Sequence, residues 1–251
     1  TRFPPARRLA LELTPTYVAS EVEKLQQETA EGVTFLEESG DVDLHAAEDT
    51  SSAVKRAALD GTLSGLELLA VAESLDVQQR ARSAMLKAHN TIRLLARIAE
   101  SIPDLHEVHR RITACIGNRG EVLDNATPSL GALRKQVRDA YQHVAEALGS
   151  IIHSRVGREA LQDQVVSMRG DRLVLQVKTD LRHRVPGIVH DASNTGATLF
   201  VEPFATVEFC NAWREAALEE ERETKRVLFE LSTWVASVAA DFQRGVQTTA
   251  E

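Results

Sequence analysis

Apolar residues recur at every third or fourth position over most of the chain, and this spacing predicts helices that bury one face. The first predicted helix ends at Gly40, because glycine favours the left-handed conformation that often follows a helix. Its apolar positions are Val18, Val22, Leu25, Val33 and Leu36. A second helix is expected from about Thr50 to Asp60, ahead of Gly61. The N-terminal part of the chain is therefore expected to be helical.

Two further helix starts are indicated by capping residues. Ser64 and Glu67 have the spacing of a capping box, and the apolar positions after them predict one long helix up to Pro103. Asp104 and Glu107 repeat that spacing and predict another helix, which the sequence Gly-Asn-Arg-Gly at 117–120 interrupts. We expect residues 1–126 to form a helical core.

Two long helices are predicted in the rest of the chain. Thr127-Pro128 places a capping residue before a proline, which suits the first position of a helix, and the apolar stripe that follows covers about 25 residues. The other helix is expected from about Phe204 to Gly245. Its middle, 219–226, offers no apolar side to a core, which predicts a solvated stretch with salt bridges between packed ends. We expect the two helices, within 127–160 and 204–251, to lie antiparallel and form an arm.

The spacing becomes strand-like between residues 164 and 203. Residues 165–168 and 173–177 flank the turn Arg-Gly-Asp-Arg at 169–172, which predicts a hairpin, and 188–190 and 197–201 supply two more short strands. The loop 191–196 contains Ser193, Asn194 and Thr195, which could contact phosphate, although such side chains more often bond their own backbone. The predicted fold class is mainly α, with a small four-stranded β-rich module, residues 161–203, inserted at the tip of the arm.

Composition narrows the class of protein. Of the 251 residues 43% are hydrophobic, which is enough for a core, and Cys115 and Cys210 have no paired spacing, which favours buried thiols in a reducing compartment. No apolar run approaches the roughly 20 residues of a membrane span, and residues 1–10 lack the apolar core of a signal peptide. We expect a cytoplasmic protein with no membrane partner.

Charge argues against a nucleic-acid affinity of the whole surface, because the net charge is −8. Residues 161–203 contain five basic and five acidic residues, so the β-rich module is neutral and the negative excess lies in the helices. The neutral module would therefore repel a nucleic acid less than the acidic helices would. The same balance is also typical of an ordinary small domain.

Catalytic motifs are not found in the sequence. No phosphate-binding glycine loop and no close His/Cys set occurs, so we expect no catalytic residue, no metal site and no cofactor in this segment. His106 and His109 share a helix face, but such a pair is more often a surface feature than a metal site. His190-Asp191 has no candidate nucleophile before it.

Three stretches of the chain, 173–178, 185–191 and 193–203, resemble the clamp region of the second bacterial MutS paralogue. This branch lacks a mismatch-recognition domain and typically carries a C-terminal Smr nuclease domain. The family more commonly has Ser-Ala-Ser-Gly where this chain has Ser-Asn-Thr-Gly at 193–196, a conservative departure. Residues 9–15, 120–124 and 211–226 have counterparts in the family's core and lever. The resemblance thus covers most of the chain.

The resemblance implies a core, lever and clamp segment that begins inside the family's first helix and stops before its ATPase domain. ATP and Mg would belong to that ATPase domain, and the resemblance implies that the full-length protein is a homodimeric ATPase and endonuclease. Its clamps would close around nucleic acid, either branched DNA in recombination suppression and DNA repair or collided ribosomes in rescue. The sequence does not choose between DNA and the ribosome.

A clamp of this kind would need basic side chains on exposed turns to contact the sugar-phosphate backbone. The candidates for nucleic-acid binding are Arg169, Arg172, Lys178, Arg182 and Arg184, with His183 as a weaker one. The alternative is a helical scaffold whose β-rich module accepts a strand of a partner protein at its sheet edge. Arginines paired with neighbouring acids would favour that alternative.

Overall fold

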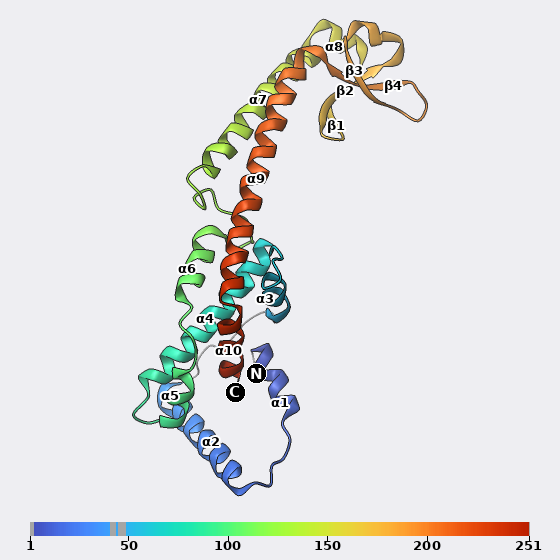
Figure 1. Cartoon of the computed structure of the whole chain (residues 1–251). Coiled ribbons are helices and arrows are strands. Elements are labelled where there is room, and N and C mark those ends of the chain that lie inside the picture. The colour runs from blue at the N-terminus through green and yellow to red at the C-terminus, as the bar shows by residue number, and fades with distance from the viewer. Residues whose placement is uncertain (1–2, 41–43, 45–48, 251) are drawn as a thin grey trace. The chain divides into compact units, whose positions relative to one another are not determined.

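The computed structural model describes residues 3–40, 44 and 49–250, and the chain divides into two compact units. We name them the helical unit, Thr1–Ala126 with Lys225–Glu251, and the sheet-bearing unit, Thr127–Thr224. Both are rich in helix, and the strands of the one sheet in the described residues lie in the second unit (Figure 1). The predicted fold class, mainly α with a small four-stranded module, is confirmed.

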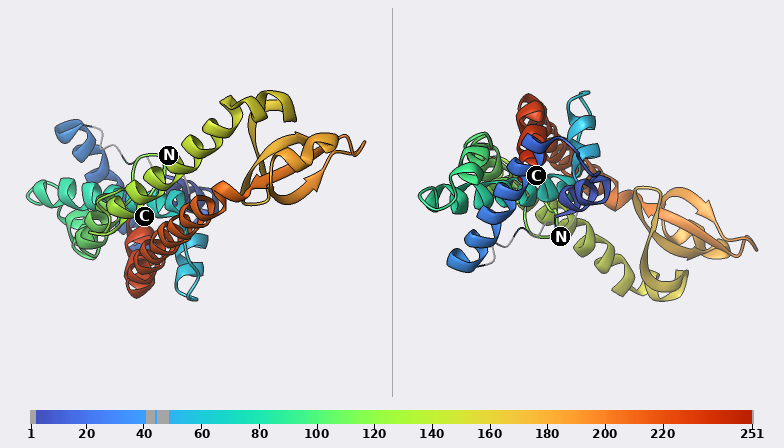
Figure 2. Two further views of the ribbon diagram at one scale, coloured as in Figure 1. Left: turned by 90° about the horizontal axis from the view of Figure 1, so that it is seen from above. Right: turned by 90° about the horizontal axis from the view of Figure 1, so that it is seen from below.

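The sheet-bearing unit inserts a small antiparallel sheet between two helices. Its elements are α7 Leu130–His153, α8 Arg155–Ala160, β1 Leu161–Arg169, β2 Arg172–Lys178, η1 Thr179–Arg184, β3 Gly187–Ala192, β4 Thr198–Pro203, η2 Phe204–Thr206 and the part of α9 Val207–Ser237 that precedes Lys225. The strand order is β1-β2-β4-β3, so β1 and β3 are the edge strands. Figures 1 and 2 show α8 leading from the end of α7 to the sheet. The predicted hairpin is β1–β2, with Gly170 at a φ of 59° in its turn.

Side-chain contacts show that α7 and the first part of α9 are antiparallel. In order from the residues just before α7 and then along it, they join Thr127 to Glu223, Arg134 to Glu220, Tyr141 to Trp213 and His143 to Phe209. The partner number falls as the α7 number rises, as two antiparallel neighbours require. Glu220 and Glu223 lie within the stretch predicted to be solvated. The stretch carries an ion pair, as predicted, but these two residues are only partly exposed, because Glu220 pairs with Arg134 of α7 and Glu223 accepts from Thr127 and Ser129 just before α7.

One apolar core joins the sheet to the helices of this unit. Leu175, Val177 and Val201 of the central strands are fully buried against Val144 and Leu148 of α7. Alternate residues of a strand face the same side, so this row fixes which face of the sheet covers the helices. On the opposite face, Val174 of β2 is also fully buried and Phe200 of β4 is 7% exposed.

The helical unit contains α1 Pro4–Glu12, α2 Ala19–Ser39, α3 Ser51–Ala57, α4 Gly65–Lys87, α5 Arg93–Glu100, α6 His106–Cys115, the last part of α9 and α10 Ala239–Ala250. Gly40 ends α2 at a φ of 75°, as predicted. The capping box is also confirmed, because the backbone N–H of Glu67 donates to Ser64 and that of Ser64 donates to the Glu67 carboxylate. The apolar spacing did not predict helix α1, although the family resemblance implied a helix at the start of the chain.

Two long helices predicted in this unit are interrupted. The helix expected up to Pro103 ends at Lys87, and a turn in which the Thr91 N–H donates to the Ala88 carbonyl at 2.9 Å leads into α5. The turn brings Ile92 into the core, where it is fully buried. The helix expected to reach Gly245 breaks at Val238, whose N–H bonds the Val235 carbonyl, three residues back. Apolar spacing continues through both breaks, which is why it did not reveal them.

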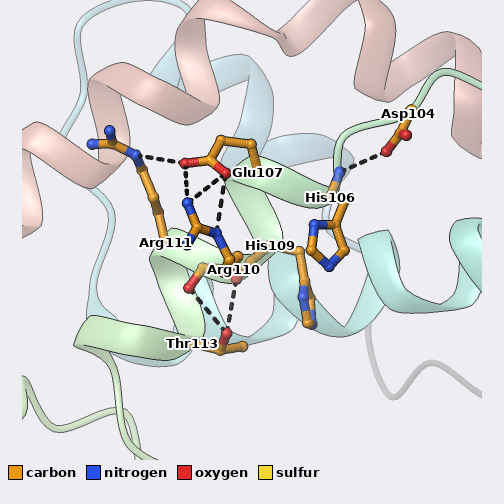
Figure 3. Close-up of polar contacts among 7 residues, drawn as sticks. All are labelled: Asp104, His106, Glu107, His109, Arg110, Arg111 and Thr113. Carbon is orange, nitrogen blue, oxygen red and sulfur yellow. Dashed lines mark hydrogen bonds and ion pairs between the residues drawn. The ribbon is translucent and has the colours of Figure 1, made fainter.

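The second predicted capping box is wrong. Asp104 accepts from the backbone N–H of His106, two residues on, at 3.1 Å, and α6 begins without a side-chain cap at Leu105 (Figure 3). Glu107 turns away from that end and binds Arg110 and Arg111. Two cations one helical turn ahead attract this carboxylate away from the capping position.

Candidate nucleic-acid interface

The six predicted basic residues lie in two places in the sheet-bearing unit. Arg169 and Arg172 flank the turn of the β1–β2 hairpin. Lys178, at the end of β2, leads into η1, which carries Arg182, His183 and Arg184. The hairpin arginines pair with acids of β3 and β4, whereas Lys178 and Arg184 bond Glu159 of α8.

The hairpin arginines are held by the module itself. Arg169 pairs with Asp191 at 3.2 Å, donates to the Met168 carbonyl and lies 3.6 Å over the ring of Phe200. Arg172 donates through Nη1 to Glu202 at 3.2 Å and to Asn211 of α9 at 2.6 Å. In the same turn Asp171 pairs with Arg214 of α9. These contacts fix the hairpin to the helix and occupy both arginines.

Glu202 is the acid around which this end of the sheet is organised. Its side chain is 1% exposed, and its second oxygen lies 2.7 Å from Nε2 of His190. The adjacent Cys210 thiol is buried, and burial, followed by the charge of Glu202, raises its pKa to about 11. A thiol with such a pKa stays protonated at neutral pH, so it has little thiolate to act as a nucleophile.

The second group faces α8. Arg184 forms an ion pair with Glu159 of α8, and Nζ of Lys178 donates to the backbone carbonyl of Glu159 at 3.2 Å. Arg182 donates to the carbonyl of Gly187 at 3.0 Å, which ties η1 to the start of β3. The His183 side chain is exposed. Lys178 and Arg184 therefore converge on one short helix.

Two further arginines on α8 complete this surface, and sequence reasoning missed them. Arg155 donates through Nε to Glu159 at 3.0 Å, and its side chain is 86% exposed. Arg158 is exposed and acts on Glu159 through its charge. The charge count of the module began at Leu161 and so excluded both. A count that continued back to the cap at Ser154 would have found them.

We call this surface the α8–η1 corner and define it by Arg155, Arg158, Glu159, Lys178 and Arg184. It places three guanidinium groups around the carboxylate of Glu159, and Lys178 bonds the backbone carbonyl of the same residue. The hydrogen bond from Arg184, followed by that from Arg155, lowers the pKa of the Glu159 carboxyl below its usual range. The corner keeps a positive excess that the hairpin end of the module lacks.

Local sequence explains why α8 lies where it does. Ser154 caps it by accepting from the backbone N–H of Gly157 at 3.0 Å, and Ala160 and Leu161 anchor its end in the core. A Cβ on Gly157 would collide with the carbonyl oxygens of Ile151 and Ile152, so glycine permits α8 to fold back against the last turn of α7. The sharp turn presents Arg155 and Arg158 beside η1.

The other candidate features have local roles or no arrangement for binding. In the 191–196 loop, Ser193 accepts from the N–H of Thr198 at 3.1 Å, so it bonds its own backbone, as the more common use predicts. The rings of His106 and His109 lie 6.4 Å apart (Figure 3). Among residues 3–40, 44 and 49–250, no group of three or more His, Cys, Asp or Glu side chains could hold a metal ion. Within that same part of the chain, no helix has both the length and the apolar character needed to cross a membrane.

Comparison with protein-family models finds no match. Curated proteins with the name Endonuclease MutS2 do match. The protein of Geobacillus thermodenitrificans is 39% identical over 241 residues, which cover 95% of this chain and 31% of that protein. Those of Shouchella clausii and Clostridioides difficile are 37% and 34% identical over 249 and 232 residues, which cover 98% and 91% of this chain and 32% and 29% of those proteins.

The chain spans about a third of the length of the curated relatives it matches. The matched residues include the strand stretches that resembled a clamp, and these now form the sheet between α7 and α9. The chain belongs to the family of the Endonuclease MutS2 proteins, of which it corresponds to one segment.

Proposed function

We propose that the sheet-bearing unit is the clamp and part of the lever of a MutS-family ATPase, and that it grips the sugar-phosphate backbone of a nucleic acid. The observation that carries this proposal is the α8–η1 corner, in which Arg155, Arg158 and Arg184 act on the carboxylate of Glu159 and Lys178 bonds its backbone carbonyl. Cations contributed by two elements and directed at one anion are the arrangement that a phosphate group requires.

The same geometry favours backbone contact over base reading. Discrimination between bases needs side chains that enter a groove on a helix or a ribbon and meet base edges. The corner instead consists of a one-and-a-half-turn helix and a 3-10 turn. Arg169 and Arg172 act as structural residues in this proposal, because Asp191 and Glu202 neutralise them.

The wider setting of the proposal is a homodimeric cytoplasmic protein that is about three times the length of this chain. ATP and Mg would bind in an ATPase domain outside this chain, and the movement of that domain would bring two clamps together, which raises affinity through multivalency. The nucleic acid would be branched DNA, in recombination suppression and DNA repair, or the RNA of collided ribosomes, in rescue. The relatives are named Endonuclease MutS2, which supports nuclease activity of such a longer protein.

The test is a charge reversal at the corner. In Arg155→Glu with Arg184→Glu, the affinity for a fluorescent four-way DNA junction is expected to fall at least about tenfold, because two phosphate contacts are lost and two repulsive charges are gained. The slope of log affinity against log salt is expected to become shallower by about 1.8. Fluorescence anisotropy between 50 and 200 mM salt measures both, and co-sedimentation with purified ribosomes provides a parallel assay.

The matched control is Arg244→Glu, which reverses an exposed cation on α10 that pairs with Asp241. It should leave the salt slope of both assays unchanged. If the double variant keeps wild-type affinity and slope for the junction and the ribosome alike, the corner is not a nucleic-acid interface. A loss confined to one assay would identify the main target.

A second candidate function, docking of a partner protein, is favoured by the edge strands and by the pairing of Arg169, Arg172 and Arg184 with neighbouring acids. Exposed apolar side chains lie on both edges, at Val165, Val166 and Met168 of β1 and at Ile188 and Val189 of β3. An edge with apolar side chains can accept a strand of another protein. Such binding would vary little with salt and would be lost in Met168→Lys. Nucleic-acid binding at the α8–η1 corner would instead depend steeply on salt and would persist in Met168→Lys.

A further inference from the structure

Glu159 occupies the position in the α8–η1 corner that a phosphate would take. Its Oε1 accepts from Nε of Arg155 at 3.0 Å, and its Oε2 pairs with Nη1 of Arg184. The two arginines come from different elements, α8 and η1, and each binds a different oxygen. The two non-bridging oxygens of a phosphodiester offer the same pair of acceptors to two guanidinium groups.

The carboxylate competes for these arginines at neutral pH. The bonds from Arg184 and Arg155 lower the pKa of the Glu159 carboxyl, so the group is ionised throughout the neutral range. Its side chain is 40% exposed, and partly exposed ion pairs of this kind are weak because water and salt screen them. A phosphate, which lies in a polyanion with a much stronger field, can therefore replace it.

Replacement does not require the backbone to move. Lys178 bonds the carbonyl of Glu159 and not its carboxylate, and Ser154 caps α8 from the other end. Rotation of the Glu159 side chain toward solvent leaves both of these contacts intact. The arginines would then be available in the places they already occupy.

We propose that Glu159 is a resident anion that a backbone phosphate displaces, so that this side chain limits the affinity of the α8–η1 corner for nucleic acid. This inference rests on the proposed function, because it concerns the regulation of the same surface. Without the carboxylate, Arg155, Arg158 and Arg184 meet the phosphate with no competitor. The site would bind a single phosphodiester weakly and would respond mainly to backbone that offers several phosphates together.

The test is Glu159→Gln, which keeps the size of the side chain and removes its charge. The junction is expected to bind about fivefold more tightly, given the size of partly exposed ion pairs. The salt slope is expected to stay close to that of the wild type, because the same arginines contact phosphate once the carboxylate has been displaced. Glu159→Asp, which keeps the charge, should bind no more tightly than the wild type.

The control is Glu146→Gln on α7, which removes the same charge from an exposed residue whose partner is Gln142. If Glu159→Gln gains no more than Glu146→Gln, the effect is one of net charge and the inference fails. If Glu159→Gln binds less tightly while its urea midpoint is unchanged, Glu159 positions the arginines and the inference also fails. Either outcome leaves the proposed function standing, which fails only if Arg155→Glu with Arg184→Glu has no effect.

Discussion

Among the acids of the sheet-bearing unit whose ion pairs are described, Glu202 is the most buried, with a side chain that is 1% exposed. Removing one partner of a buried ion pair leaves a charge without compensation, and Arg172 supplies the permanent cation here. Arg172 itself is 23% exposed, so solvent screens part of the effect. The contacts of this one carboxylate thus determine the stability of the hairpin end.

We expect Arg172→Met to lower the free energy of unfolding by about 2 to 3 kcal/mol, measured by urea denaturation. Adding Glu202→Gln to that variant should restore part of the loss, because the uncompensated charge is removed. A loss below about 0.5 kcal/mol would mean that Arg172 behaves as an ordinary surface residue. That result would return Arg172 to the set of candidates for nucleic-acid contact.

At the same scale, the sequence shows which charges are present but not how they pair. The even count of acids and bases in 161–203 correctly indicates a neutral module. It does not reveal that Asp191 of β3 neutralises Arg169 and that Glu202 of β4 neutralises Arg172. Nor does it reveal that Arg184 of η1 and the two arginines of α8 share Glu159. Strand register and the fold of a six-residue helix decide these pairings, and both depend on contacts between residues distant in sequence.

Helix α8 shows how one glycine can position the α8–η1 corner. Gly157 lies against the carbonyl oxygens of Ile151 and Ile152, whereas Gly149, one turn before the end of α7, has open space around its Cα. An alanine at 149 adds no contact and removes backbone freedom from the unfolded chain. An alanine at 157 must displace α8.

We expect Gly157→Ala to lower the free energy of unfolding by about 2 to 4 kcal/mol, and Gly149→Ala to raise it by about 0.5 to 1 kcal/mol. Gly157→Ala should also weaken junction binding, because Arg155 and Arg158 move away from η1. Urea denaturation and anisotropy measure the two effects. Equal stability of the two variants would contradict the close approach of α8 to α7.

The elements that sequence predicted well are those whose signal is local. The hairpin turn at Gly170, the end of α2 at Gly40 and the Ser64 capping box all depend on a few adjacent residues. The interruptions at 88–92 and at Val238 depend on which apolar residues the core requires. Tertiary packing can break a helix where periodicity continues, so these positions need the structure.

On the scale of the whole chain, the boundary between the two units falls within α9, between Thr224 and Lys225. A helix can cross such a boundary because its own backbone hydrogen bonds need no neighbour. The sequence indicated the antiparallel pairing of two long helices. It did not indicate that the charged residues Glu220 and Glu223 hold α7 through Arg134, Thr127 and Ser129.

The sheet-bearing unit has its own core and its own helix pair, so we expect residues 127–224 to fold when expressed alone. Its core joins Val144 and Leu148 of α7 to Leu175 and Val201 of the sheet, and Trp213 packs against the edge of Tyr141. Trp213 is the one tryptophan in this segment, so its fluorescence reports the helix pair directly. The expected result is a cooperative urea transition seen alike by Trp213 fluorescence and far-UV circular dichroism. Leu148→Ala should lower its free energy of unfolding by about 2 to 5 kcal/mol. A segment that shows helix signal without a cooperative transition would mean that the other unit is needed to complete this fold.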